Sequence, residues 1–128
     1  MTMLFVLEDS VQDLRAAEDA ARVAGFDPVQ AKASTTSAVS RLLRMLLDSS
    51  KLPDAFLIDL DLGQESGYEL LSFRHSRPEL SAIPAIVWTH LDSHHQQMCE
   101  VFGISEFVDK ADGIESLETA LAKVVHKH

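Results

Sequence analysis

The chain has 128 residues, a length that fits one domain with a single hydrophobic core. Hydrophobic residues make up 46% and charged residues 24%, as in ordinary globular proteins, and no apolar run approaches the roughly 20 residues of a membrane span. The formal net charge of −9 argues against a nucleic-acid-binding surface, because phosphate contacts need clustered lysines and arginines.

The first part of the chain alternates between strand and helix patterns. An apolar run at 3–7 predicts a strand, and a helix pattern follows it. The inner face of that helix carries Val11, Leu14, Ala17 and Ala21. Ser10, with Asp13 three residues later, is typical of a capping box at the helix start, and Gly25 ends the helix. Residues 28–33 alternate apolar and polar, which predicts a half-exposed strand.

The same alternation continues through the middle of the chain. Thr35 or Thr36 is expected to cap a second helix. Its predicted inner face consists of Val39, Leu42, Leu43, Leu46 and Leu47. Residues 55–60 are apolar apart from one aspartate and predict a buried strand. A third helix is expected from about Gly67 to Arg77.

The last part of the chain completes the pattern. A loop is expected at 78–84 between two prolines, then a strand at 85–88. The next helix should bury Met98, Val101 and Phe102 and stop at Gly103. A short strand at 106–109 leads to the final helix. That helix should bury Ile114, Leu117, Leu121 and Val124.

Alternating strands and helices predict one α/β domain over residues 1–128, with a parallel sheet covered by helices on both faces. We expect a doubly wound, flavodoxin-like fold of five strands and five helices. Only 28–33 alternates in polarity, which suggests a strand at the sheet edge and agrees with strand order 2-1-3-4-5. In such folds the functional site lies at the carboxyl ends of the strands, where the order reverses.

Polar and charged residues stand at most of these predicted strand ends. They are Glu8, Asp9, Asp59, Asp61, Thr89 and Lys110. Gathered carboxylates repel by on the order of 4 kcal/mol per pair at about 4 Å and an effective dielectric constant of about 20, and one lysine offsets only part of this. A divalent cation that prefers oxygen ligands, Mg²⁺ (or Mn²⁺), would balance the rest. A metal and a lysine beside an aspartate suit phosphoryl transfer to that aspartate.

Over essentially the whole chain, the sequence resembles the receiver domain of two-component response regulators, in particular the single-domain, chemotaxis-regulator-like members. Short segments at the strand ends carry the resemblance: 5–10, 57–62, Gly67, 87–89 and 107–110. Each segment is a weak signal alone, whereas all of them in this order are specific.

The resemblance implies a role for each acidic residue. Asp59 would be the phospho-acceptor. Asp9 would bind the metal directly, and Glu8 would act mostly through water. Asp61 would supply a backbone carbonyl to the same metal.

The resemblance also implies a switch and its partners. Thr89 and Lys110 would bind phosphoryl oxygens, and Phe107 would turn inward when Thr89 moves. The changed surface of the fourth helix, fifth strand and fifth helix would then recruit a downstream protein. The phosphoryl donor would be a histidine kinase or a histidine phosphotransfer protein of a phosphorelay.

Several further expectations follow for the whole protein. It would not be an enzyme, although it would assist its own phosphorylation and dephosphorylation, and its output would be by docking. We expect a monomer or weak dimer without nucleic-acid or membrane partners. The single cysteine, Cys99, cannot form an internal disulfide, and a reduced, cytoplasmic location fits it best.

The sequence departs from the family pattern near the site. Gly63 and Ala111 stand where the family usually has proline; Gly63 should make its loop more flexible, and the peptide bond before Ala111 should be trans. His90 stands where a small residue is common and could narrow access to the site. Leu91 and Asp61 occupy positions that tune the loss of the phosphoryl group in the family, and an apolar Leu91 predicts a long-lived phosphorylated state.

Other functions are compatible with parts of this pattern. The crevice could serve a hydrolase or phosphotransferase that acts on a small substrate. The fold could also be an interaction module that works without phosphorylation. His90, His94 and His95 have a spacing that can bind zinc, but no cysteine or carboxylate cluster completes a set.

Overall fold

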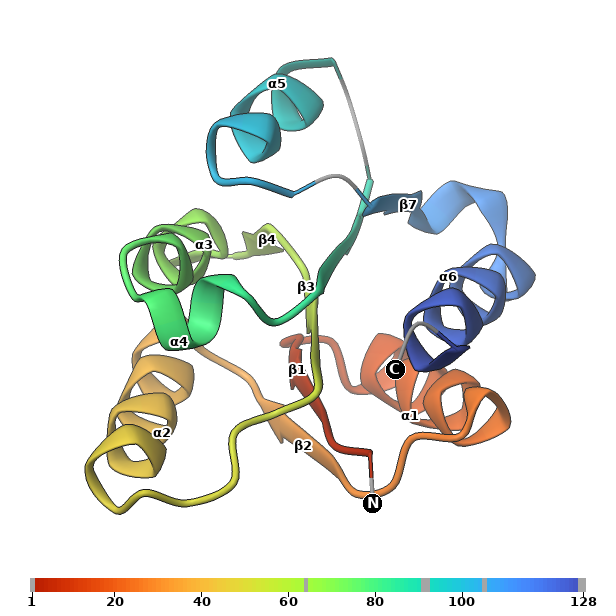
Figure 1. The fold of residues 1–128 in the computed structure, drawn as a ribbon. Helices are drawn as coiled ribbons and strands as arrows, with labels where there is room; N and C mark the ends of the chain where they lie inside the picture. Colours follow the sequence, from red (N-terminus) through yellow and green to blue (C-terminus); the bar gives the residue numbers. More distant parts are fainter. Residues whose placement is uncertain (1, 64, 91–92, 105, 127–128) are drawn as a thin grey trace.

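The computed structural model of the chain describes residues 2–63, 65–90, 93–104 and 106–126. Its centre is a parallel sheet of five strands in the order β2-β1-β3-β6-β7 (Figure 1). The strands are β1 (Leu4–Leu7), β2 (Val29–Lys32), β3 (Ala55–Ile58), β6 (Ala85–Thr89) and β7 (Glu106–Asp109). This is the predicted order, with the half-exposed strand β2 at the edge, so the expected doubly wound fold is confirmed.

Helices cover both faces of the sheet, as Figure 1 shows. One face is covered by α1 (Val11–Ala24) and α6 (Ile114–His126). The other is covered by α2 (Thr35–Leu47), α3 (Tyr68–His75), α4 (Pro78–Ser81) and α5 (Ser93–Val101). In the described part of the chain, no helix combines the length and the apolar character needed to cross a bilayer.

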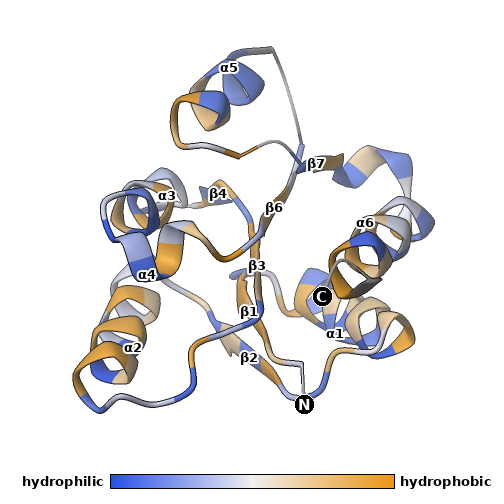
Figure 2. Cartoon of the chain, in the orientation of Figure 1, coloured by the Kyte–Doolittle hydropathy of each residue, from blue (hydrophilic) through white to orange (hydrophobic). Residues whose placement is uncertain are grey.

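The alternation of side chains along the strands divides the core into two layers. On β1, Leu4 and Val6 pack toward α1 and α6, whereas Phe5 and Leu7 pack toward the other helices. Because both faces are covered, all four residues are buried. Figure 2 shows the result as mostly hydrophobic central strands between helices that also carry hydrophilic residues. The single cysteine, Cys99, is buried on the inner face of α5, and burial raises the pKa of its thiol to about 11.

Several residues that were predicted for the inner faces of helices are exposed. Val11, Leu47 and Val101 are exposed, Leu47 by 82%. Leu43 and Ile114 are also partly exposed. These residues have helical spacing, but spacing alone does not identify which apolar side chains are buried. On α2 the predicted burial of Leu42 is confirmed, and the other buried residues, which were not predicted for this face, are Thr35, Ala38 and Met45.

Several short elements were not predicted. A hairpin of β4 (Asp61–Leu62) and β5 (Glu65–Ser66) follows β3, and α4 occupies the expected loop at 78–84. The third helix consequently ends at His75, two residues early. The buried guanidinium of Arg74 holds α4 in place, donating hydrogen bonds to the carbonyls of Ser81 and Ile83.

The hairpin also explains the start of α2. Ser34, not Thr35 or Thr36, is its N-cap, and its hydroxyl accepts a hydrogen bond from the Ser37 N–H. Thr35 is buried because its hydroxyl donates to the Ser66 carbonyl at 3.0 Å. Its backbone N–H donates to the Glu65 carboxylate at 2.9 Å. The α2 start is therefore fixed by contacts with residues about thirty positions later.

Candidate functional site

The carboxyl ends of β1, β3, β6 and β7 meet at one edge of the sheet, because all four strands run parallel. A hollow of about 180 Å³ lies there. Its walls include every predicted residue of the phosphorylation and metal site: Glu8, Asp9, Asp59, Asp61, Thr89 and Lys110. Ser10, Asp13 and His90 complete them.

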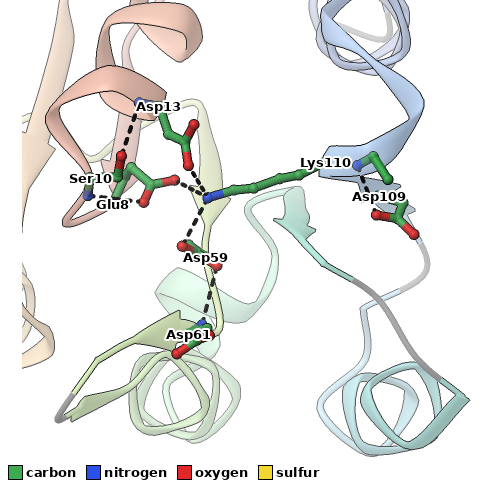
Figure 3. Close-up of polar contacts among 8 residues, drawn as sticks. Glu8, Ser10, Asp13, Asp59, Asp61, Asp109 and Lys110 are labelled. Carbon is green, nitrogen blue, oxygen red and sulfur yellow. Dashed lines mark hydrogen bonds and ion pairs between the residues drawn. The ribbon is translucent and has the colours of Figure 1, made fainter.

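Lys110 lies at the centre of this site. Its ammonium nitrogen Nζ is 2.7 Å from Asp13 Oδ2, 2.8 Å from Glu8 Oε1 and 3.1 Å from Asp59 Oδ2 (Figure 3). The same nitrogen lies 4.8 Å from the centre of the Trp88 ring. An ammonium has three N–H donors, so three carboxylates occupy all of them.

Asp13 is the site residue that the sequence interpretation missed. The Ser10 hydroxyl does accept the Asp13 N–H at 3.2 Å, which confirms the N-cap. The second half of the predicted capping box is wrong, because the Asp13 carboxylate binds Lys110 and the Ser10 N–H donates to Glu8 at 3.3 Å. The sequence did contain a signal for Asp13. It stands four residues after Asp9, about one helical turn, so its side chain can face the same edge of the sheet.

Burial and nearby charges shift the pKa values of Glu8 and Lys110. Burial raises the pKa of Glu8 to about 7; the nearby charge of Asp59 adds to this, while the hydrogen bond from Lys110 opposes it. For Lys110, burial alone would lower the pKa. The hydrogen bonds to Asp13 and Glu8 and the charge of Asp59 outweigh burial and raise that pKa above its ordinary value.

Three of the acidic residues form a cluster with the chemistry of a divalent-cation site. Carboxylate oxygens of Glu8, Asp9 and Asp59 lie within 4.8 Å of one another. Glu8 and Asp59 are buried and Asp9 is exposed. Hard cations such as Mg²⁺ and Mn²⁺ prefer such oxygen ligands, so the residues fit the predicted metal. The exposed Asp61 is not in this cluster; its backbone N–H donates to Asp59 Oδ1 at 3.1 Å.

The loop after β3 holds Asp59 in place. The backbone N–H of Asp59 donates a hydrogen bond to the Leu7 carbonyl at 3.0 Å, which connects the end of β3 to β1. Gly67 packs directly on this loop and donates its N–H to the Leu60 carbonyl. A Cβ atom at position 67 would lie 2.2 Å from the Asp59 carbonyl oxygen and 2.9 Å from Leu60 Cα. The predicted glycine is therefore required by close backbone packing.

We expect Gly67→Ala to destabilise the protein by about 1–3 kcal/mol, the usual cost of overpacking, because two backbone segments must separate. Urea unfolding measures this change. Gly113→Ala is a useful comparison, since an added Cβ there meets no atom within 4 Å and the cost arises only from its φ of +89°. Unchanged stability in Gly67→Ala would show that the loop relaxes freely.

The structure shows why proline does not fit at positions 63 and 111. Gly63 has a φ of +71°, a conformation that proline cannot adopt. Ala111 donates its N–H to Asp109 Oδ1 at 2.9 Å, which starts the short 3₁₀ helix η1 (Lys110–Asp112); proline has no N–H to donate. The peptide bond before Ala111 is trans, as predicted. Leu91 lies outside the described residues.

The remaining predicted residues have clear positions. Thr89 is buried at the end of β6, opposite Asp109 of β7. Phe107 is half-buried on β7 and packs against the core layer that contains Cys99. His90 is exposed at the rim of the hollow, whereas the His95 ring nitrogen Nδ1 shares a hydrogen bond with the Tyr68 hydroxyl. Across the described ranges, no cluster of three potential metal ligands includes a histidine, so the zinc alternative has no support.

Comparison of the structure with solved structures identifies its fold. The phosphorylated cyanobacterial phytochrome response regulator RcpA matches with a TM-score of 0.78 and 22% identity, over 96% of this chain and 90% of that one. The Mn²⁺-bound response regulator Rcp1 matches with a TM-score of 0.74 and 20% identity, over 97% and 91%. A response regulator receiver domain from Rhodospirillum rubrum matches with a TM-score of 0.78 and 23% identity, over 96% and 90%.

The sequence itself gives no match to a protein-family model or to a curated protein. At identities of 22%, 20% and 23%, these structural similarities establish the fold. The chain has the flavodoxin-like fold of response regulator receiver domains.

Proposed function

We propose that the chain is a response regulator receiver domain that accepts a phosphoryl group on Asp59. The observation that carries the proposal is the contact of a buried Asp59 carboxylate with the Lys110 ammonium, in a hollow that also contains Asp9 and Thr89. A buried acid beside a positive charge and further acidic ligands has the composition of a phosphoryl-transfer site. The relatives of the same fold include a phosphorylated response regulator.

Mg²⁺ or Mn²⁺ would bind beside Asp59, and a relative of the same fold is a Mn²⁺-bound form. Asp9 and Asp59 would be direct ligands, with the backbone carbonyl of Asp61. Glu8 would act through water, because its two carboxylate oxygens already accept hydrogen bonds from Lys110 and the Ser10 N–H. When bound, the metal would neutralise charge on the transferred phosphoryl group.

The side chains of this chain would then carry the transfer. An Asp59 carboxylate oxygen attacks the phosphorus of a phosphohistidine, the new O–P bond forms as the N–P bond breaks, and the electron pair of that bond returns to the donor nitrogen. Lys110 pairs with one phosphoryl oxygen and the Thr89 hydroxyl binds another. The role of the protein is to position and neutralise these groups, which is the main source of catalysis in phosphoryl transfer.

The output of this switch would be a changed surface over α5, β7 and α6. Thr89 and Phe107 lie on the neighbouring strands β6 and β7. In the proposed switch, movement of Thr89 toward the phosphoryl group would make room for Phe107 to turn inward. A second hollow, of about 460 Å³, lies between β7 and α6 and includes Phe107 in its wall. A downstream protein would dock on this surface, and a histidine kinase or phosphotransfer protein in the cytoplasm would supply the phosphoryl group.

Incubation with acetyl phosphate or phosphoramidate and Mg²⁺, read by intact mass, tests the proposal. We expect the mass to rise by one phosphoryl group, and Asp59→Asn to abolish the adduct because it removes the nucleophile. Asp112→Asn is a matched control, since Asp112 is an exposed aspartate of η1. The absence of an adduct in the unsubstituted protein, with no beryllofluoride binding, would favour an interaction module that works without phosphorylation.

The alternative of an enzyme acting on a small substrate has weaker support. Pockets for small molecules usually have volumes of about 300–1,000 Å³, with mostly apolar walls. The hollow around Asp59 is only about 180 Å³, and most of its lining residues are charged. A hollow of this size suits a phosphoryl group and a metal ion. We therefore propose a phospho-acceptor protein and not a classical enzyme.

A further inference from the structure

Lys110 enters the proposed reaction with its hydrogen-bonding capacity full. Its ammonium has three N–H donors, and Asp13, Glu8 and Asp59 each accept one. Its side chain is only 9% exposed, so water does not supply much of its solvation. Phosphorylation turns the Asp59 carboxylate into an acyl phosphate, so the ammonium must move to a phosphoryl oxygen while Asp13 and Glu8 still hold two of its N–H donors.

Exposure to water determines which of these two carboxylates, Asp13 or Glu8, can release Lys110. The Asp13 side chain is 38% exposed, whereas Glu8 and Asp59 are 1% and 5% exposed. A released Asp13 carboxylate is hydrated at once. A released Glu8 would remain buried without its counter-ion, which is far more costly. The contact between Asp13 and Lys110 is therefore the one that can be exchanged.

On the basis of the proposed phosphorylation of Asp59, we infer that Asp13 is a positioning residue that holds Lys110 in the unphosphorylated protein and releases it to the phosphoryl group. Figure 3 shows the Asp13 carboxylate, which extends from the first turn of α1, directed at the end of the Lys110 side chain. Because this contact stabilises the unphosphorylated arrangement and is lost afterwards, Asp13 opposes phosphorylation. It sets how readily the site accepts a phosphoryl group.

The first test compares phosphorylation rates with phosphoramidate at fixed Mg²⁺. Asp13→Asn keeps the size of the side chain and removes its charge, so we expect phosphorylation to be faster by roughly two- to fivefold, the range for a half-exposed ion pair. Asp19→Asn is the matched control, because it removes the same charge from the same helix where Asp19 pairs only with exposed Arg22 among the described contacts. An unchanged or slower rate in Asp13→Asn would overturn the inference.

The second test separates release of Lys110 from a general loss of negative charge. In a Lys110→Met background, Asp13→Asn should have no further effect on the phosphorylation rate, because the two residues act through one contact. If Asp13→Asn still accelerates the reaction there, Asp13 acts by repelling the anionic donor, and the positioning role is wrong.

The third test requires no phosphorylation. Trp88 is the only tryptophan of the chain, and its ring lies 4.8 Å from the Lys110 ammonium. Its emission should change in metal-free Asp13→Asn, in the same direction as when the unsubstituted protein binds beryllofluoride. Unchanged emission would contradict the inference that Asp13 holds Lys110 in place. If the unsubstituted protein forms no phosphoryl adduct, the proposed function fails, while the emission of metal-free Asp13→Asn still reports whether Asp13 holds Lys110.

Discussion

Replacement of Lys110 by methionine is expected to destabilise the metal-free protein by about 3 kcal/mol at pH 8, because it removes the charge that pairs two buried carboxylates. Glu8 and Asp59 would then face each other without a counter-ion. The loss should be smaller at pH 6. Burial already raises the pKa of Glu8 to about 7, so a proton neutralises this carboxyl at the lower pH. Urea unfolding at both pH values, with a chelator present, measures the effect.

Lys123→Met is the matched control for this substitution. Lys123 is exposed on α6 and lies 3.9 Å from Glu106, a surface pair that contributes less than about 1 kcal/mol. We expect Lys110→Met also to slow phosphorylation from phosphoramidate, while Lys123→Met leaves the rate unchanged. Equal stability losses in the two variants, at both pH values, would contradict the central role of Lys110.

Replacement of Glu8 by glutamine is expected to stabilise the metal-free protein at pH 8 by about 3 kcal/mol. The pKa of Glu8 rises from 4.5 to about 7 on folding, chiefly because burial disfavours its charged form. Between pH 4.5 and about pH 7, Glu8 carries a proton in the folded chain and has lost it in the unfolded chain. The contribution of Glu8 to stability is therefore greatest below pH 4.5 and declines as the pH rises through 7. Glutamine does not titrate, so this decline should be absent.

The measurement is the difference in unfolding free energy between Glu8→Gln and the unsubstituted protein across this pH range. We expect almost no difference near pH 4.5 and the full difference by pH 8. Glu100→Gln, at an exposed position of α5, should follow the unsubstituted protein. A Glu8→Gln variant less stable than the unsubstituted protein at pH 8 would show that the Lys110 contact outweighs burial.

The sheet and most of the site could be predicted because both depend on simple patterns. Apolar runs without alternation indicate strands buried on both faces, and parallel strands bring their carboxyl ends to one edge. Asp59 and Lys110, 51 positions apart, could therefore be placed together before any contact was known. The fold confirms this placement.

The errors have a different cause, since they depend on distant contacts. Leu47 and Val101 have helical spacing but are exposed, because spacing alone does not tell which part of a helix packs against the sheet. Thr35 is buried because the hairpin of β4 and β5 satisfies its polar groups. Asp13 fitted a local capping pattern, and only the fold shows that Lys110, 97 positions later, competes for its carboxylate.

Cys99, on the buried face of α5, provides a chemical probe of the motion of this helix. It is the only thiol of the chain, it is fully buried, and its raised pKa keeps it protonated and unreactive while α5 is in place. An alkylating reagent can reach it only when α5 lifts from the sheet. The rate of alkylation therefore measures how often α5, one helix of the proposed output surface, opens locally, separately from unfolding of the whole domain.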